Sequence, residues 1–128
     1  MTIADDAAGS GMGFDTITLA ALDATDDLGL DALPFGVISM DAEGVVRRYN
    51  RVESQMAGLS REKVLGEIFF LTTGVCMNNY LVAQRFEDEA VLDVILDYVL
   101  TFRMRPTPVK LRLLKQGDSR FRYVLIQR

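Results

Sequence analysis

The end of the chain alternates apolar and polar residues with a period of two, and this pattern constrains the fold most strongly. Segments 109–116 (VKLRLLKQ) and 120–127 (RFRYVLIQ) are typical of strands, and the Gly117-Asp118-Ser119 turn between them predicts an antiparallel hairpin. We expect apolar residues of the two strands to pair across one face, with Val109, Leu111 and Leu113 opposite Phe121, Tyr123 and Leu125.

A second hairpin is predicted near the start of the chain. PFGVISMD at 34–41 and VVRRYN at 45–50 are typical strands joined by a turn, and Gly36 indicates a place where another backbone approaches closely. A fifth strand is predicted over 94–105, which ends before two prolines. Between the hairpins, short helices stop at Gly58 and Gly66, and the apolar spacing over 78–94 favours a longer amphipathic helix.

These elements predict one α+β domain built on a single antiparallel five-stranded sheet, with short helices over one face. The 128 residues are enough for one core. Residues 26–128 would form this domain, while residues 1–25 would form a flexible, acidic N-terminal cap. Short helical segments are predicted at 14–23, within the cap, and at 28–33, just after it.

Composition excludes several classes of protein. With one cysteine and no histidine, the chain lacks the usual ligands of zinc and cannot form an internal disulfide, which fits a cytoplasmic protein without a metal. No apolar run approaches the roughly 20 residues that span a bilayer, and the start lacks a signal-peptide pattern. We therefore expect no membrane association.

Charge is distributed unevenly along the sequence. Nine acidic residues precede the first basic residue, Arg47, whereas from Thr101 onward eight basic residues face a single acid, Asp118. The basic end could be a nucleic-acid surface. We favour a solvated strand face, partly matched by the acidic N-terminal segment, and expect no nucleic-acid partner.

The segment from Arg47 to Cys76 holds the residues most suited to chemistry, namely Tyr49, Glu53 and Cys76. Without a histidine to act as base, Cys76 is a poor hydrolytic nucleophile, so we expect no enzyme, but the thiol is a suitable attachment point. Each residue also has a structural interpretation. Cys76 could be a small buried apolar residue, Glu53 a solvated acid at a helix start, and Tyr49 a core residue.

The segments LPFGVISMDAEGVVRRYNRVES, KVLGEIFF and FRMRPTPVKLRLLKQGDSRFRYVLIQR, together with Cys76, resemble the photoactive yellow protein family. The resemblance runs from about Asp26 to Arg128 and implies a PAS fold, with a cavity between the sheet and the short helices. It also implies a blue-light receptor in which Cys76 carries 4-hydroxycinnamic acid (p-coumaric acid) through a thioester. Tyr49 and Glu53 would hydrogen-bond the phenolate, and Tyr98 and Met104 fall near chromophore-lining positions.

Three positions depart from the family pattern. Ala57 and Leu59 stand where the family has a threonine that supports the phenol-binding tyrosine and an arginine that shields the pocket, and Val75 replaces a proline before the cysteine. We expect an altered absorption maximum or photocycle rate. The alternative function is a chromophore-less PAS module that binds another ligand or a protein. In either case the sequence contains no output domain, so a separate downstream signalling partner is expected.

Overall fold

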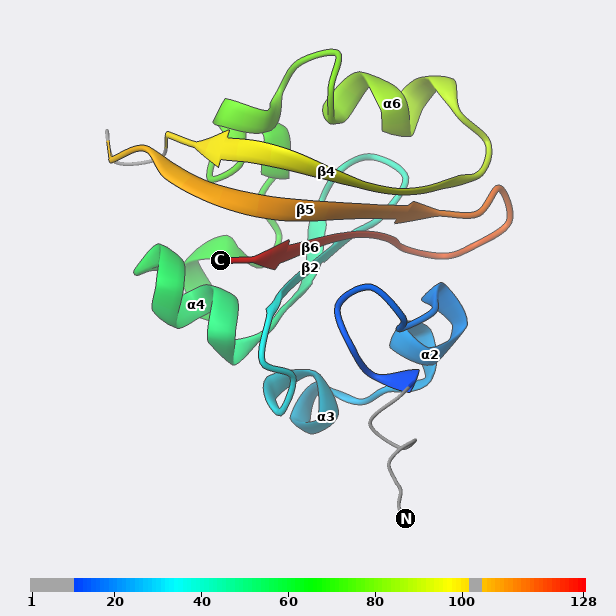
Figure 1. The fold of residues 1–128 in the computed structure, drawn as a ribbon, viewed down its shortest axis with the longest axis horizontal. Coiled ribbons are helices and arrows are strands. Elements are labelled where there is room, and N and C mark those ends of the chain that lie inside the picture. Colours follow the sequence, from blue (N-terminus) through cyan, green and yellow to red (C-terminus); the bar gives the residue numbers. More distant parts are fainter. Residues whose placement is uncertain (1–10, 102–104) are drawn as a thin grey trace.

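A five-stranded antiparallel sheet forms the centre of the computed structural model, which describes residues 11–101 and 105–128. The strands are β2 (Gly36–Met40), β3 (Val46–Tyr49), β4 (Leu92–Leu100), β5 (Thr107–Lys115) and β6 (Arg122–Gln127). Their order across the sheet is β3-β2-β6-β5-β4 (Figure 1). The predicted fold class is confirmed, and the two predicted hairpins meet where β2 pairs with β6.

Short helices connect and cover the strands. They are α2 (Leu19–Ala24), α3 (Asp27–Asp31), α4 (Arg51–Ala57), α5 (Arg61–Val64) and α6 (Ala83–Asp88), with 3₁₀ turns η1 (Phe69–Leu71) and η2 (Val75–Met77). The side chains of Thr18, Asp26 and Asn50 cap α2, α3 and α4 by accepting a backbone N–H three residues on. Gly58 ends α4 in the left-handed conformation, as its position in the sequence predicts.

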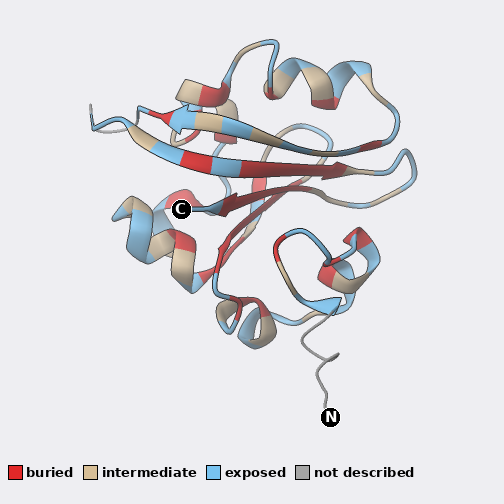
Figure 2. Cartoon of the chain, viewed as in Figure 1, coloured by how far each residue is buried: buried red, intermediate tan, exposed pale blue. Residues whose placement is uncertain are grey.

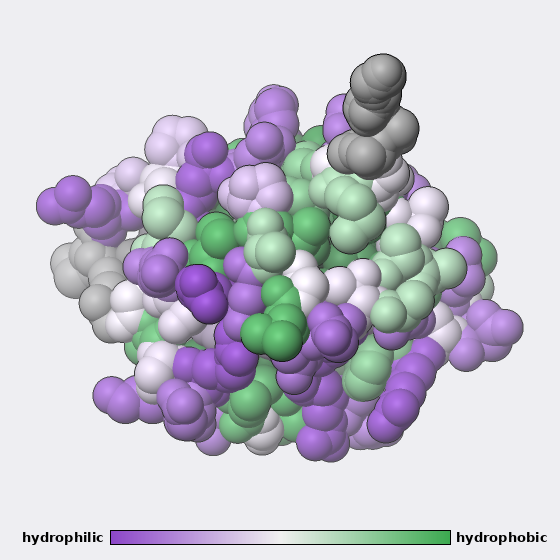
Figure 3. Space-filling model, turned by 90° about the horizontal axis from the view of Figure 1, so that it is seen from below, coloured by the Kyte–Doolittle hydropathy of each residue, from purple (hydrophilic) through white to green (hydrophobic). Residues whose placement is uncertain are grey.

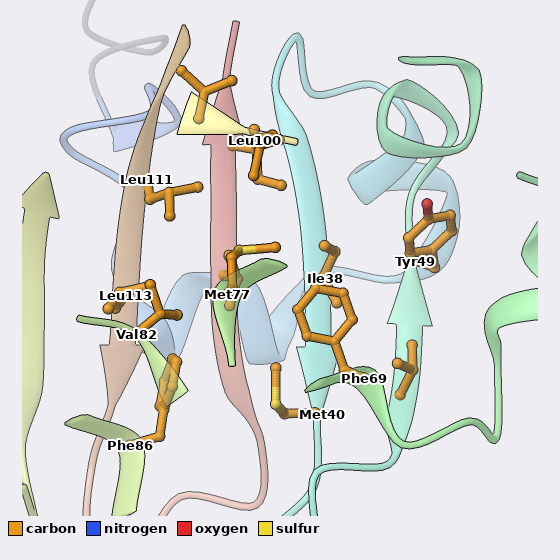
Figure 4. Packing of buried hydrophobic residues seen from close by; sticks show 14 of the residues in the cluster. Ile38, Met40, Tyr49, Phe69, Met77, Val82, Phe86, Leu100, Leu111 and Leu113 are labelled. Carbon is orange, nitrogen blue, oxygen red and sulfur yellow. The ribbon is translucent and has the colours of Figure 1, made fainter. Parts of the chain in front are cut away.

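The sheet is covered on both faces, and the two faces carry separate apolar clusters. On one face, residues from α5, η1, η2 and α6 pack on the sheet, with Phe69, Met77 and Phe86 among the largest (Figure 4). The other face lies under the N-terminal segment, which contributes Phe14, Ile17, Leu22 and Leu30. Figure 2 shows the resulting band of buried residues along the central strands.

Because both faces are apolar, the predicted partners in the last hairpin are wrong. Leu111 pairs with Ile126 and Leu113 with Val124, whereas Tyr123 and Leu125 face the N-terminal segment instead. When both faces of a strand are buried, consecutive residues are apolar, so the sequence does not show which residues of the two strands lie on the same face. The hairpin was therefore predicted correctly and its register was not.

The predicted helix over 78–94 is also wrong. Only six residues, Ala83–Asp88, are helical in α6, and β4 already begins at Leu92. β4 pairs with β5 along all nine of its residues. These long-range hydrogen bonds override a helical spacing that local sequence alone supports. Similarly, the segment predicted at 14–23 is helical only from Leu19.

Two arginines of the sheet hold the N-terminal segment through its backbone carbonyls. Arg112 on β5 is buried and donates to the oxygens of Phe14 and Ile17 at 3.0 and 2.6 Å. Arg48 on β3 donates to the oxygens of Leu22 and Thr25. Figure 1 shows α2 and α3 gathered on one side of the sheet, and their outer surface mixes hydrophilic and hydrophobic residues (Figure 3).

Within the described residues, the basic residues near the end of the chain form ion pairs with acids of α4, α6 and β4 and not with the acidic N-terminal segment, which differs from the prediction. Four such ion pairs occur within the described ranges: Lys110–Asp97, Arg112–Asp93, Arg122–Glu87 and Arg128–Glu53. The absence of a nucleic-acid partner remains a prediction. The division of the chain at residues 25 and 26 also remains a prediction.

We predict that Arg112→Met lowers the free energy of unfolding by about 2 to 4 kcal/mol, because two carbonyl oxygens are left without donors. Lys110→Met is the matched control on the same strand. Its ion pair with Asp97 is exposed and should contribute less than ~1 kcal/mol. Urea unfolding measures both, and equal losses in the two variants would contradict a role for Arg112 in docking the N-terminal segment.

Candidate functional site

A cavity of about 340 Å³ opens between the sheet, α4 and the η1–η2 segment. Its volume lies at the lower end of the roughly 300–1,000 Å³ that small-molecule sites occupy. Tyr49, Glu53 and Cys76, which are separated by up to 27 positions in the sequence, all line it. The cavity is otherwise largely apolar, with Ile38, Leu59, Phe69, Met77, Leu100 and Ile126 among its walls.

Asn50 positions the first turn of α4, which carries Glu53. Its Oδ1 accepts from the backbone N–H of Glu53 at 3.1 Å and of Val37 at 2.9 Å. Its Nδ2 donates to the carbonyls of Leu30 and Phe35 at 2.9 and 3.0 Å. One buried amide thus joins α3, β2 and α4 and fixes where the Glu53 side chain leaves the helix.

Gly36 on β2 leaves room for the Glu53 carboxylate. A Cβ atom at this position would lie 2.2 Å from Oε1 of Glu53, well inside van der Waals contact. The sequence predicts close approach by another backbone, but the group that approaches Gly36 is a side chain. The glycine therefore belongs to the site as well as to the strand.

Glu53 is buried and forms a bidentate ion pair with Arg128. The Arg128 Nη1 and Nη2 atoms lie 2.8 and 3.3 Å from its two oxygens, and the Glu53 side chain is 5% exposed. The interpretation of Glu53 as a solvated helix-start acid is thus wrong. Burial raises the pKa of Glu53 above its ordinary value, and the Arg128 guanidinium offsets part of that shift.

Tyr49 ends β3 and contributes its phenol to the cavity. Burial raises the pKa of its hydroxyl well above the ordinary value, and the nearby charge of Glu53 raises it further. Its backbone carbonyl accepts from Arg61 Nε at 2.8 Å, but the hydroxyl has no hydrogen-bond partner among the described residues. A neutral phenol in this position is a donor available to a ligand.

Cys76 lies in η2, half-buried, as a free thiol. Thr73, in the loop before it, also lines the cavity, and its buried Oγ1 lacks a hydrogen-bond partner in the described part of the chain. A buried hydroxyl without a partner is costly unless a ligand or water satisfies it. The region around the thiol therefore offers a ligand both an attachment atom and a polar contact.

Of the other two predicted site residues, the structure describes only Tyr98. Tyr98 is not among the residues that line the cavity. Its hydroxyl donates to the Cys76 carbonyl at 2.7 Å and accepts from Asn79 Nδ2 at 2.7 Å. Tyr98 therefore stabilises the turn that carries Cys76 without lining the cavity. Met104 lies outside the described residues. Ala57 and Leu59, the departures noted above, do line the cavity.

Four polar residues that line the cavity were not predicted from the sequence, namely Thr73, Arg105, Thr107 and Arg128. Strand periodicity could have found Arg128, since it follows cavity-lining Ile126 by two positions and so continues the same face of β6. Figure 1 shows the end of β6 beside α4. Arg105 and Thr73 come from loops, where no periodicity applies.

Sites of other kinds are not found in residues 11–101 and 105–128. They contain no cluster of three or more cysteine or acidic side chains that could bind a metal ion. Within the same ranges, no helix has the length and apolar character needed to cross a membrane.

Curated relatives of the chain share one name. The photoactive yellow protein of Rhodothalassium salexigens is 32% identical over 103 aligned residues, and the match covers 77% of this chain and 82% of the relative. That of Halochromatium salexigens is 33% identical over 92 aligned residues, and the match covers 70% of this chain and 74% of the relative. No family model matches the chain.

Solved structures agree with these relatives. The photoactive yellow protein domain of the sensor histidine kinase Ppr from Rhodospirillum centenum superposes with a TM-score of 0.77 at 33% identity, covering 85% of this chain and 98% of that domain. The PAS domain of an HTR-like protein from Haloarcula marismortui has a TM-score of 0.59 at 18% identity, covering 86% of this chain and 98% of that one. This second likeness shows the PAS fold alone.

We predict that Gly36→Ala lowers the free energy of unfolding by about 1 to 3 kcal/mol, because the added methyl group displaces the Glu53 carboxylate from Arg128. Gly117→Ala is the control, since a Cβ there would meet nothing closer than 3.7 Å. This control should lower the free energy of unfolding by less than ~0.5 kcal/mol. Thermal and urea unfolding give both values, and a neutral Gly36→Ala would show that Glu53 is not packed against β2.

Proposed function

The chain belongs to the photoactive yellow protein family, and we propose that it is a blue-light photoreceptor in which Cys76 carries 4-hydroxycinnamic acid as a thioester. The observation that carries the proposal is the convergence of Tyr49, Glu53 and Cys76 on one cavity. Membership in the family supports the light-sensing role. The pigment and the roles of individual residues are our inference.

The residues present fit such a pigment. A planar, elongated phenol with one acyl end needs a sulfur at one end of an apolar cavity and hydrogen-bond donors at the other. Cys76 provides the sulfur, and Tyr49 provides a phenolic hydroxyl with no partner among the described residues. The unpartnered Thr73 hydroxyl, three positions before Cys76, suits a polar atom near the attachment point.

Attachment requires an activated 4-hydroxycinnamoyl donor, such as a thioester or an anhydride. The Cys76 sulfur attacks the acyl carbon, a carbon–sulfur bond forms, and the bond to the leaving group breaks. The leaving group departs with the electron pair, and the thiol proton is lost to solvent. The missing histidine is no obstacle, because the activated donor carries a good leaving group and water can take the thiol proton, and the thioester once formed needs no catalytic base.

The bound pigment would supply light absorption and trans-to-cis isomerisation. In the dark, Tyr49 and a protonated Glu53 would donate hydrogen bonds to the phenolate oxygen and keep it ionised in an apolar site. When isomerisation breaks these bonds, the phenolate loses its stabilisation and Glu53 transfers its proton to it. The new carboxylate is buried, and the change in charge would loosen the surrounding elements.

The alternative is a PAS module that binds another ligand or a protein and carries no pigment. The ion pair between Glu53 and Arg128 favours it, since a carboxylate that accepts two N–H groups is ionised and cannot donate to a phenolate. Ala57 and Leu59 add no polar side chain to the cavity. Pigment binding would have to shift the proton onto Glu53, whereas another ligand would not.

In either case we propose that the domain passes its signal to a component of signal transduction. The similar domain from Rhodospirillum centenum belongs to a sensor histidine kinase, which supports a partner in signal transduction. We expect no enzymatic activity, a cytoplasmic location and no metal. The N-terminal segment, held through carbonyls by Arg48 and Arg112, is the element that we propose to loosen after light absorption.

We predict that the protein becomes yellow when it is expressed with activated 4-hydroxycinnamate and gains the mass of one 4-hydroxycinnamoyl group. Intact-mass measurement and visible absorption report the two effects. The gain should vanish in Cys76→Ala and persist in Val75→Ala, a control that changes the exposed neighbouring residue. An unmodified wild-type chain would overturn the pigment and leave the alternative function.

For the loaded protein, we predict that Glu53→Gln shifts the absorption band to longer wavelength, because a neutral amide is a weaker donor to the phenolate than a carboxylic acid. Glu43→Gln, in the exposed turn after β2, is the control and should leave the band unchanged. An unshifted band in Glu53→Gln would place the pigment's oxygen away from α4.

A further inference from the structure

Arg128 is a cation of the cavity, and it takes no part in the function proposed above. It follows β6 directly, lines the cavity, and lies 2.8 Å from Glu53 with a side chain only 16% exposed. Both of its terminal nitrogens point to the two carboxylate oxygens, which is the strong, orienting geometry of an arginine and a carboxylate. A guanidinium held in this way stays charged at any pH that the fold survives.

We propose that Arg128 supplies the fixed positive charge of the cavity and keeps its acidic partner, Glu53 or a bound phenol, in the anionic form. The part that concerns the phenol rests on the function proposed above. The part that concerns Glu53 does not, because that contact is present in the protein alone.

The proposal follows from counting the charges that face the cavity. Glu53 and a phenolic ligand are two acids, and burying two anions side by side is unfavourable. With Arg128 present, one anion is neutralised, so the pair of acids holds one proton between them and the net charge is zero. Without Arg128 the remaining anion is buried and unpaired, and the pair of acids takes up a second proton at a higher pH.

Besides the Cys76 thiol, two other ionisable groups face the same space from neighbouring elements. The Tyr49 phenol, from β3, stays neutral, since burial and the charge of Glu53 raise its pKa and the charge of Arg128 offsets only part of that rise. Arg105, from the segment between β4 and β5, also lines the cavity but is exposed, so water and salt screen its charge. Arg105 therefore serves as the matched control, with the same chemical group on the same cavity and a different degree of burial.

The first test uses the pigment-loaded protein. We expect Arg128→Gln to raise the pKa at which the bound phenol loses its yellow, anionic band by about one unit or more, the usual effect of one close opposite charge. Arg128→Lys keeps the charge and should move the pKa by less than half as much. Arg105→Gln should leave it within ~0.3 units. Equal shifts in Arg105→Gln and Arg128→Gln, or none in Arg128→Gln, would overturn the proposal.

The second test uses the protein without pigment and so separates this proposal from the proposed function. Carbon-13 NMR of the side-chain carboxylate follows the titration of Glu53 directly. Arg128→Gln should raise the pKa of Glu53 by about one unit or more relative to wild type, with Arg105→Gln close to wild type. If wild type accepts no pigment but this shift occurs, the photoreceptor fails and the role of Arg128 stands. An unchanged pKa of Glu53 in Arg128→Gln would overturn the role proposed for Arg128.

Discussion

The hydrogen bonds of Asn50 are the interaction on which the cavity depends. The buried amide of Asn50 caps α4 and binds backbone groups of α3 and of the start of β2. Its oxygen accepts two N–H groups and its nitrogen donates to two carbonyls, so a side chain of another size or polarity cannot form all four hydrogen bonds. Removing the amide would deprive the N–H groups of Val37 and Glu53 and the carbonyl of Phe35 of this buried partner, which is costly, whereas the Leu30 carbonyl still accepts from the backbone N–H of Leu33 at 3.2 Å. The position of Glu53 is thus set by a neighbour that never contacts the cavity.

The two covered faces of the sheet give the molecule a means of communication between the cavity and the N-terminal segment. β2 contributes Ile38 to the cavity face and Val37 to the opposite face, and β6 alternates in the same way. Asn50 also binds the carbonyls of Leu30 and Phe35, which lie at the boundary of that segment. Asn50 therefore links α4 directly to the backbone of α3 and of the residue before β2 by hydrogen bonds.

Sequence reasoning predicted the features that local chemistry determines. The hairpin turns, the glycine that ends α4 and the five strands follow from turn residues and periodicity. The family resemblance singled out Tyr49, Glu53 and Cys76, which line one cavity, and their roles in binding remain a proposal. The predictions failed where contacts between residues far apart in the sequence determine the structure. The register of β5 on β6 depends on which face the N-terminal segment covers, and the length of α6 depends on how early β4 meets β5. Arg128 reaches Glu53 across 75 positions, so no local pattern pairs them.

The ion pair changes how a charge-driven switch could work in this chain. Were Glu53 alone, its ionisation would leave a buried anion with no partner, at a cost of several kcal/mol available to open the structure. With Arg128 at 2.8 Å, the anion finds a guanidinium in place, and much of that cost disappears. The cost that remains is that of separating Arg128 from the ligand when Arg128 pairs with the newly ionised Glu53. The opening would then be driven less by an unpaired buried charge than by the exchange of partners at Arg128. Its extent would depend on how tightly Arg128 is held at the end of β6.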